Sequence, residues 1–303
     1  DRPRAVVAAG PDSRLLRAVL EPWCPVPFVA WPGPSLPGWA GSLDLVVVLA
    51  PEGNDSGTAS AVAEAVRRGC QLVVACPARS MVAEHAAGRH STILPVTTGD
   101  QLATAVVMLE FLERLDLGPE SDAEAVATAL DEVAIACSPY RNLAVNPAKS
   151  LASGLADSLP LVWGGSVLSA RAARRIAESI RRTSGRAALA ADAEHLLPVI
   201  AAARQHDVFA DPFADAGTAE DPAADRRPFL VVLDDGSADA SVREQRGRLV
   251  AAADARGVRV ETVATDAANE VARYAALLAT GTFAAAYLAV GLGQVLPGDL
   301  GPR

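Results

Sequence analysis

Short apolar segments alternate with longer amphipathic segments along most of the chain, and this pattern predicts alternating strands and helices. The run Leu45-Val46-Val47-Val48-Leu49-Ala50 is continuously apolar, as expected for a parallel strand buried on both faces. In the first half, strands are predicted at 5–9, 26–30, 43–50, 71–76 and 92–96, and helices at 13–20, 58–68, 81–87 and 100–115. This order predicts a parallel sheet with helices on both faces.

The second half repeats this plan after a predicted connecting helix at 123–137. Strands are predicted at 161–163, 187–191, 229–234 and 258–263, and helices at 166–183, 194–204, 241–256, 267–279 and 283–292, with Ser166 or Ser169 as the cap of the first helix. Residues 206–228, rich in Asp, Ala and Pro, are expected to form a loop. The two similar halves suggest an internal duplication. They predict an α/β protein with a first domain at 1–120, a connecting segment at 121–149 and a second domain at 150–303.

The composition favours a soluble enzyme-like or binding domain over a nucleic-acid or membrane protein. Of the 303 residues, 50% are apolar but only 4% are aromatic, so the core is expected to consist of Ala, Val and Leu. The net charge of -9 argues against a nucleic-acid partner, because duplex binding requires a basic surface. Without an apolar run near the ~20 residues that span a bilayer, and without a signal-peptide pattern, a cytoplasmic protein is the default expectation.

Six arginines gather on one predicted helix and just beyond its end, and two interpretations are open. They are Arg171, Arg174, Arg175, Arg181, Arg182 and Arg186. A solvated helix face is one interpretation, since cations near a helix C-terminus interact favourably with its dipole. An anion-binding site is the other.

Cysteines and histidines show no spacing typical of metal ligands or disulfides. Cys24, Cys70, Cys76 and Cys137 lack a C-x-x-C arrangement, and we expect them to be small core residues in a reducing compartment. His85, His90, His195 and His206 lack the H-x-x-x-H spacing of a metal site. We therefore predict neither a metal nor another cofactor.

Several motifs resemble the bifunctional phosphoglucose/phosphomannose isomerase family, whose members contain two tandem SIS (sugar isomerase) domains. N-P-A-K-S-L-A at 146–152, which contains the only lysine, is followed by P-L-V-W-G at 160–164. The segment 281–289 is similar to that family's last-helix pattern G-D-x-x-S-x-Y-L-A, and Arg243 and Gly257-Val258 match a family arginine and turn. The resemblance implies two SIS domains, each a parallel sheet flanked by helices, in a homodimer.

The resemblance also implies where a sugar phosphate would bind. Two loops of the first family domain hold phosphate and resemble G-x-G-G-S and S-x-S-G-N-T-E-E-T; such loops offer backbone amides and hydroxyl groups at a helix N-terminus. Residues 8–13 and 50–58 correspond to them. The candidate ligand-binding residues are Gly53, Asn54, Ser56 and Thr58 in the first domain, and Gly165 and Ser166 in the turn that opens a helix of the second.

Acidic residues interrupt these phosphate loops. Asp12, Glu52 and Asp55 stand where hydroxyl groups are expected. Two like charges about 4 Å apart repel by roughly 4 kcal/mol at an effective dielectric constant near 20, which is close to the whole binding free energy of a millimolar ligand, about 4 kcal/mol. A dianionic sugar phosphate is therefore not expected to bind as in the family. Bound Mg²⁺ or Ca²⁺ could compensate, but helix caps and solvated turns explain the same carboxylates without a ligand.

The residues that would catalyse isomerisation are largely missing. The resemblance places a catalytic glutamate, in a pattern like N-E-N-x-K, where this chain has Arg182, and arginine cannot act as a base. Glu194-His195 lies near the family's histidine motif P-E-L-x-H-N-E, but the surrounding motif is absent, and no lysine follows Lys149. Glu178, His195 and His206 remain weak candidates for catalysis.

Two functional hypotheses follow. The first is a catalytically inactive SIS-fold protein that binds a carbohydrate derivative. The second is an active aldose–ketose isomerase that acts on a sugar phosphate or related sugar derivative through relocated residues such as Glu178, His195 or His206. A sugar-responsive regulator is a further possible use of the fold.

Overall fold

The chain folds into two compact units, Asp1–Glu124 and Ala125–Arg303. The structure, a computed structural model, describes residues 2–11, 13–203 and 226–294. Each unit contains a parallel sheet flanked by helices, which confirms the predicted α/β class. Most of the predicted loop at 206–228 lies outside the described residues. The candidate His206 and the loop residue Asp12 also lie outside them.

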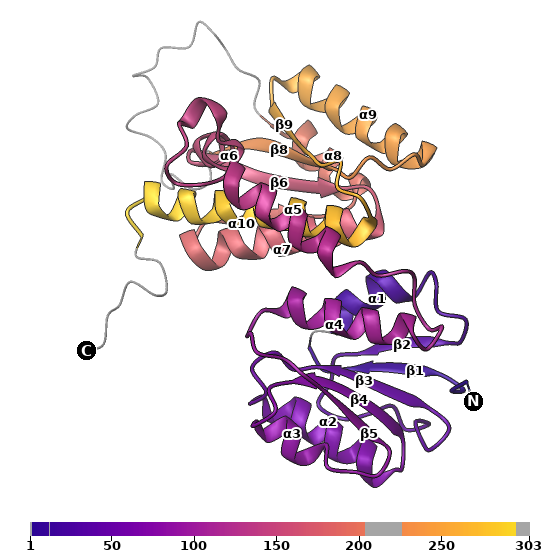
Figure 1. The fold of residues 1–303 in the computed structure, drawn as a ribbon. Helices are drawn as coiled ribbons and strands as arrows, with labels where there is room; N and C mark the ends of the chain where they lie inside the picture. Colours follow the sequence, from indigo (N-terminus) through magenta and orange to yellow (C-terminus); the bar gives the residue numbers. More distant parts are fainter. Residues whose placement is uncertain (1, 12, 204–225, 295–303) are drawn as a thin grey trace, which may run out of the picture. The chain divides into compact units, whose positions relative to one another are not determined.

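The first unit contains a five-stranded parallel sheet in the order β2-β1-β3-β4-β5. Its strands are β1 (Val6–Ala9), β2 (Phe28–Trp31), β3 (Leu45–Leu49), β4 (Gln71–Cys76) and β5 (Ser91–Pro95). Its helices are α1 (Ser13–Leu20), α2 (Ser56–Arg67), α3 (Met81–His85) and α4 (Gln101–Glu113). Helices α2 and α3 cover one face, and α1 and α4 cover the other (Figure 1). All five residues of β3 are buried, as its continuous apolar sequence predicts.

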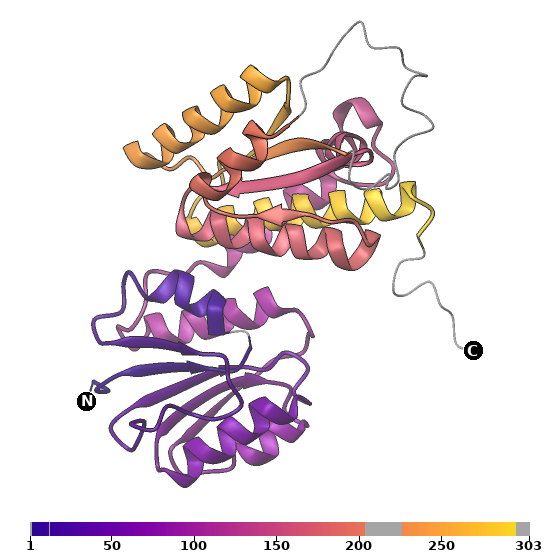
Figure 2. The same cartoon turned by 180° about the vertical axis from the view of Figure 1, so that it is seen from behind.

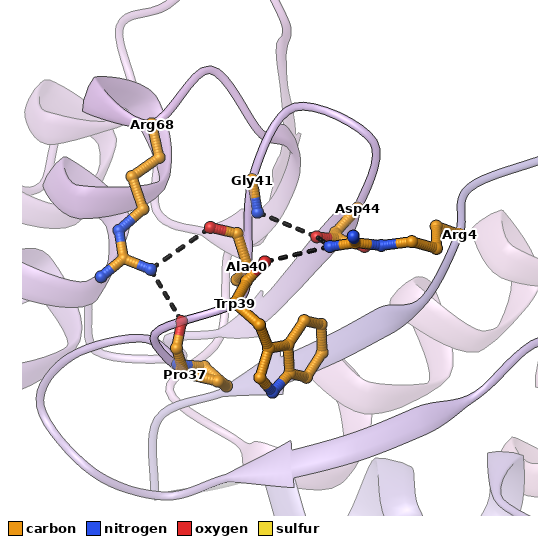
Figure 3. Close-up of polar contacts among 7 residues, drawn as sticks. All are labelled: Arg4, Pro37, Trp39, Ala40, Gly41, Asp44 and Arg68. Carbon is orange, nitrogen blue, oxygen red and sulfur yellow. Dashed lines mark hydrogen bonds and ion pairs between the residues drawn. The ribbon is translucent and has the colours of Figure 1, made fainter.

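The connection from β2 to β3 is not a helix but an irregular segment, residues 32–44, which we call the strap. Leu36 and Ala40 of the strap are buried in the same core cluster as α2 and α3. Arg68, at the end of α2, donates from Nη1 to the carbonyl oxygens of Pro37 (2.7 Å) and Ala40 (3.2 Å), as Figure 3 shows. Two buried apolar side chains and one arginine thus hold the strap where a crossover helix commonly lies.

The second unit contains a four-stranded parallel sheet in the order β7-β6-β8-β9. Its strands are β6 (Ser158–Gly164), β7 (Leu189–Ala190), β8 (Arg227–Asp234) and β9 (Arg259–Ala264). Its helices are α5 (Ala123–Ala136), the 3₁₀ helix η1 (Leu143–Val145), α6 (Pro147–Leu155), α7 (Val167–Ser184), α8 (Ala193–Ala201), α9 (Ala240–Arg256) and α10 (Glu270–Gly291). Helices α8 and α9 pack on one face, and α7 and α10 on the other (Figure 2).

The two sheets share a strand order. In each sheet, the second strand in sequence lies outside the first, and the third and fourth strands extend on the first strand's other side. This shared order is what an internal duplication would produce. Contacts group residues 125–149, most of the predicted connecting segment, with the second unit.

The two predicted C-terminal helices, 267–279 and 283–292, are in fact one continuous helix, α10. Gly281 lies inside this helix and does not end it. A Cβ atom at this position would lie 2.4 Å from Ile176 of α7, so a glycine here permits close packing of the two helices. The small residues of α10 therefore pack against α7 and α6 of the same unit. Among the described residues, α10 alone is long and apolar enough by length and composition to cross a membrane, but 56% of its apolar window is buried inside the protein.

Candidate functional site

The candidate loops of both units follow the carboxyl ends of parallel strands, where ligands of open α/β sheets commonly bind. In the first unit, residues 50–58 connect β3 to α2. In the second unit, Gly164-Gly165-Ser166 connects β6 to α7, and residues 235–239 connect β8 to α9. Strands β6 and β8 are hydrogen-bonded neighbours, so the latter two loops meet at one edge of the sheet.

In the first unit, Gly53 has a structural role in the loop. Its φ of +69° is a conformation that glycine adopts without strain, and a Cβ atom here would lie 2.4 Å from the Cβ atom of Ser80. Its carbonyl oxygen also accepts a hydrogen bond from the backbone of Val82 (3.0 Å), which ties the loop to the start of α3. Asn54 and Ser56, two further candidates, have exposed side chains.

The carboxylate of Asp55 takes up both hydrogen-bond donors of Thr58. Asp55 caps α2, and its Oδ2 accepts from the Thr58 backbone nitrogen (2.8 Å) and from Thr58 Oγ1 (3.0 Å). Thr58 is only 2% exposed and lies against Gly10 of the neighbouring loop. The hydroxyl group expected to bind phosphate is therefore buried and already bonded to an internal anion, while Glu52 is exposed.

In the second unit, Ser166 caps α7, as the sequence predicts. Its Oγ accepts from the Ser169 backbone (3.0 Å), and its own backbone nitrogen donates to Ser169 Oγ (2.9 Å), which forms a capping box. Gly165 before it is tightly packed. A Cβ atom at Gly165 would lie 2.4 Å from Val242 and 2.8 Å from the Trp163 ring.

Sequence reasoning missed Asp235, which reaches the same turn from the loop after β8. Ser166 Oγ donates a short hydrogen bond to Asp235 Oδ2, and the Ser237 backbone donates to Asp235 Oδ1 (3.2 Å). Arg273 of α10 donates to the Asp235 carbonyl oxygen (3.3 Å). The adjacent Asp234 is paired with Arg246. A pair of aspartates where a buried strand ends, Asp234 in the strand and Asp235 directly after it, was the available signal.

Glu178 and His195, the two catalytic candidates among the described residues, do not lie at this edge. Glu178 lies well along α7, about 18 Å from Ser166 at a rise of ~1.5 Å per residue, and its Oε2 accepts from Arg175 (2.8 Å). His195 is exposed in the first turn of α8, beside Glu194, whose carboxylate pairs with Arg248 (2.7 Å). Hydrogen bonding to Arg248 lowers the pKa of Glu194, which keeps this carboxyl charged and unsuited to act as an acid.

Three arginines of α7, Arg174, Arg175 and Arg181, have partners within the second unit. Arg174 pairs with Asp192 (3.8 Å), and Arg181 donates to the carbonyl oxygen of Ala188 (2.7 Å). Arg182, at the position of the family's base, is exposed in the last turn of α7. These contacts favour the solvated-face interpretation over an anion site.

The N-P-A-K segment holds a turn of the backbone. Asn146 caps α6 and is 1% exposed; its Nδ2 donates to the carbonyl oxygen of Ser138 (3.0 Å). Lys149 Nζ donates to the carbonyl oxygens of Pro139 (2.7 Å) and Arg141 (2.8 Å). The motif thus fixes the turn at 138–141, between α5 and η1.

Tyr287 of the last helix completes this arrangement. Its ring lies 5.5 Å from Lys149 Nζ, a cation–π distance, and its hydroxyl group donates to the Cys137 carbonyl oxygen (2.5 Å). We call Asn146, Lys149 and Tyr287 the clamp. The two sequence segments that carry the family resemblance therefore contact each other in space.

Three of the four cysteines lie in the core, as predicted, whereas Cys24 does not. Cys70, Cys76 and Cys137 are buried free thiols, and burial raises the pKa of each thiol above its ordinary value, which keeps it neutral. Cys24 is half-buried and also free. Within the described ranges, no group of three or more His, Cys, Asp or Glu side chains is arranged to hold a metal ion.

Comparison with known proteins identifies the family. The model of the bacterial phospho-glucose isomerase C-terminal SIS domain matches residues 144–295, half of the chain. The protein therefore belongs to this SIS family, and the expected resemblance to phosphoglucose isomerases is confirmed. No curated protein matches the chain in sequence.

Solved structures share the fold across nearly the whole chain. Tagatose-6-phosphate ketose/aldose isomerase from Escherichia coli is 13% identical with a TM-score of 0.68, covering 100% of this chain and 86% of its own. The C-terminal domain of glucosamine-fructose-6-phosphate aminotransferase from Francisella tularensis is 12% identical with a TM-score of 0.67, covering 97% and 87%. A glucose-6-phosphate isomerase like protein from Thermus thermophilus is 17% identical with a TM-score of 0.58, covering 97% and 83%.

Proposed function

We propose that this protein binds a carbohydrate derivative through its SIS fold and does not catalyse aldose–ketose isomerisation. The observation that carries the proposal is the contact between Asp55 and Thr58. Both donors of Thr58 are bonded to the Asp55 carboxylate, at 2.8 and 3.0 Å, so the loop that would hold a sugar phosphate is occupied by the chain's own anion. The exposed Arg182 at the base position and the dispersed positions of Glu178 and His195 support the same conclusion.

We further infer that the first unit is a second SIS domain, in tandem with the one that the family model matches. The shared strand order of the two sheets supports this inference. Similar structures named for tagatose 6-phosphate and glucosamine-fructose-6-phosphate enzymes suggest sugar derivatives as the ligand class. A cytoplasmic location stays a prediction from the composition of the sequence.

Enzyme assays would test the absence of catalysis. The substrates would be fructose 6-phosphate and mannose 6-phosphate, and the assay would be coupled to detection of glucose 6-phosphate. We expect turnover no faster than the uncatalysed background. The matched variants Glu178→Gln and His195→Ala should behave as the wild type does. Turnover by the wild type that either substitution abolishes would establish the alternative, an isomerase with relocated residues.

A binding experiment would test the rest of the proposal. We expect thermal stabilisation by one or more unphosphorylated hexoses or amino sugars, and none by millimolar hexose 6-phosphates. Stabilisation by hexose 6-phosphate that is lost in Thr58→Val would contradict the proposed state of the first-unit loop.

The resemblance also motivates a homodimer, which we propose without assigning its interface. The alanine-rich helix α10 packs against α6 and α7 inside the second unit. Sedimentation velocity of the full chain would give a mass of twice 31.2 kDa for a dimer. A concentration-independent monomer would refute it.

A further inference from the structure

Four large apolar residues are exposed around the turn that the clamp holds. They are Ile135 at the end of α5, Tyr140 in the turn, and Leu143 and Val145 in η1. Tyr140 is 97% exposed and the other three are more than half exposed. We call these four residues the turn surface. Exposed apolar residues are ordinary when they are scattered, but a group of them in one short segment is typical of an interaction site.

Helix α5, which leads into the turn surface, is also poorly covered. Its sequence, AEAVATALDEVAIA, consists mostly of alanine, valine, leucine and isoleucine, yet only Val126 and Ala129 are buried. A surface helix of a globular protein normally buries a broad apolar stripe. The helix and the turn therefore leave apolar area uncovered next to each other.

The turn surface is held in a fixed shape. Lys149 Nζ donates to the carbonyl oxygens of Pro139 (2.7 Å) and Arg141 (2.8 Å), one on each side of Tyr140. Tyr287 donates to the Cys137 carbonyl oxygen just before the turn. A surface that is already ordered loses little conformational entropy on binding, and aromatic residues such as tyrosine commonly dominate the energy of an interface.

Charges of opposite sign lie on the two sides of the turn surface. Asp131 and Glu132 precede Ile135 by four and three residues, so they share its face of α5. Arg141 directly follows Tyr140 at the other side, and all three charged residues are exposed. Within the described residues, none of these three side chains has an ionic partner.

This arrangement of charges identifies the partner as a second copy of the chain. In a two-fold contact one surface meets itself, so opposite charges on its two sides come together twice. We propose that two copies meet through the turn surface, with Arg141 of each copy facing the Asp131 and Glu132 carboxylates of the other. Two chains with a net charge of -9 repel each other overall, so their contact requires such local matching of charge.

The exposed apolar area is sufficient for the centre of such a contact. A tyrosine side chain buries roughly 150–250 Å², and the three aliphatic side chains bring the total to on the order of 400 Å² per copy. This is about half of the ~800 Å² that each partner contributes to a standard interface. The charged residues beside it would form the polar rim. The inference rests on the proposed homodimer, to which it assigns an interface, and not on the proposed ligand.

Sedimentation velocity of the full chain over a concentration series tests the apolar part of the surface. Ile135→Ser should raise the dimer dissociation constant about tenfold or more, because an apolar contact is lost in both copies. Leu43→Ser is the matched control, since Leu43 of the strap is 65% exposed and Ile135 is 66% exposed. This control should dimerise as the wild type does. The melting temperature shows whether each variant is folded.

Reversal of charge tests whether the surface binds itself. Arg141→Glu should raise the dissociation constant about tenfold at low ionic strength, because it places like charges opposite each other in two symmetric contacts. Adding Asp131→Lys and Glu132→Lys to this variant reverses all three signs. The triple variant should return to within about threefold of the wild-type dissociation constant.

Three results with folded variants would overturn the turn surface alone: a wild-type dimer that Ile135→Ser and Arg141→Glu both leave intact, an equal loss in Leu43→Ser, or no recovery in the triple variant. A wild type that stays monomeric at every concentration would overturn this proposal and the homodimer together. None of these results depends on whether the chain binds or isomerises a sugar, which the thermal-shift and coupled assays report separately.

Discussion

The carboxylate of Asp44 is buried at the end of the strap and bonded from two sides. Arg4 donates to it from Nε (2.9 Å) and Nη2 (2.6 Å), and the Gly41 backbone donates to Oδ2 (2.8 Å), as Figure 3 shows. Burial alone would raise the pKa of Asp44, but the hydrogen bonds from Arg4 and Gly41 outweigh burial and lower this pKa below its ordinary value. The charged form is therefore part of the folded state.

Asp44→Asn should lower the free energy of unfolding by about 2 kcal/mol at pH 7, because it removes charged hydrogen bonds at a buried position. Chemical denaturation would measure this change. Glu120→Gln, which removes an exposed carboxylate of the same unit, is the control and should change little.

The effect of Asp44 should depend on pH in a defined direction. Because its folded-state pKa is lowered, its contribution is complete above the unfolded-state pKa of about 3.9 and is lost as the pH falls through the folded-state value. The stability difference between wild type and Asp44→Asn should therefore shrink below about pH 4. A difference that stays constant down to pH 2 would contradict the assigned role.

At the residue scale, the sequence could predict local contacts but not distant ones. Asp55 as the cap of α2 follows from its position before a helical pattern, and the structure confirms it. The contact between Ser166 and Asp235 depends on β6 and β8 being neighbours in the sheet. No local propensity encodes that pairing, so Asp235 was not among the candidates.

At the scale of elements, the clamp fixes the turn between α5 and η1. Lys149→Met removes both hydrogen bonds to the carbonyl oxygens of Pro139 and Arg141 while keeping most of the side-chain volume. Because the Arg141 carbonyl belongs to the bond that trypsin cuts, we expect cleavage after Arg141 to become about tenfold faster, as local opening becomes easier.

Limited proteolysis with mass spectrometry would measure this rate. Cleavage after the exposed Arg89, in the first unit, is an internal standard and should not change. Tyr287→Phe, which removes the donor to Cys137, should accelerate cleavage after Arg141 to a smaller extent. An unchanged rate in Lys149→Met would show that the lysine does not hold the turn.

Two helical glycines should respond in opposite directions to the same substitution. Gly281→Ala places a Cβ atom 2.4 Å from Ile176, and such overpacking costs about 1–3 kcal/mol, more than the ~1 kcal/mol that alanine gains in helix propensity. Gly247, exposed in the middle of α9, has no atom within 4 Å of the same position. Gly247→Ala should therefore stabilise by roughly 0.5–1 kcal/mol.

Thermal denaturation of both variants would decide this prediction. If Gly281→Ala were as stable as Gly247→Ala, close packing would not explain why α10 is continuous. The same pair explains why the predicted break in α10 is wrong. Local preference places a helix end near Gly281, whereas packing against α7 makes glycine favourable inside the helix. The other predicted helices and strands are present and differ at their ends, whereas η1 and α6 were not among the predicted elements.

At the scale of the whole molecule, each unit has its own core. The buried cluster that contains Val46, Val48 and Leu72 draws only on the first unit, and the cluster that contains Leu161, Leu230 and Leu249 draws only on the second. Units with separate cores and sheets are expected to open as separate cooperative units.

Combining the two destabilising substitutions tests this independence. Asp44→Asn should lower hydrogen-exchange protection in the first unit alone, because it removes hydrogen bonds there, and Gly281→Ala should lower it in the second alone, because it overpacks the contact with α7. In the double variant, each unit should show the same loss as in the corresponding single variant to within about 0.5 kcal/mol, as for distant sites with no shared partners. Hydrogen exchange read by mass spectrometry separates peptides of β3 from peptides of β8. A loss of protection in β3 caused by Gly281→Ala would mean that the chain unfolds as one cooperative body.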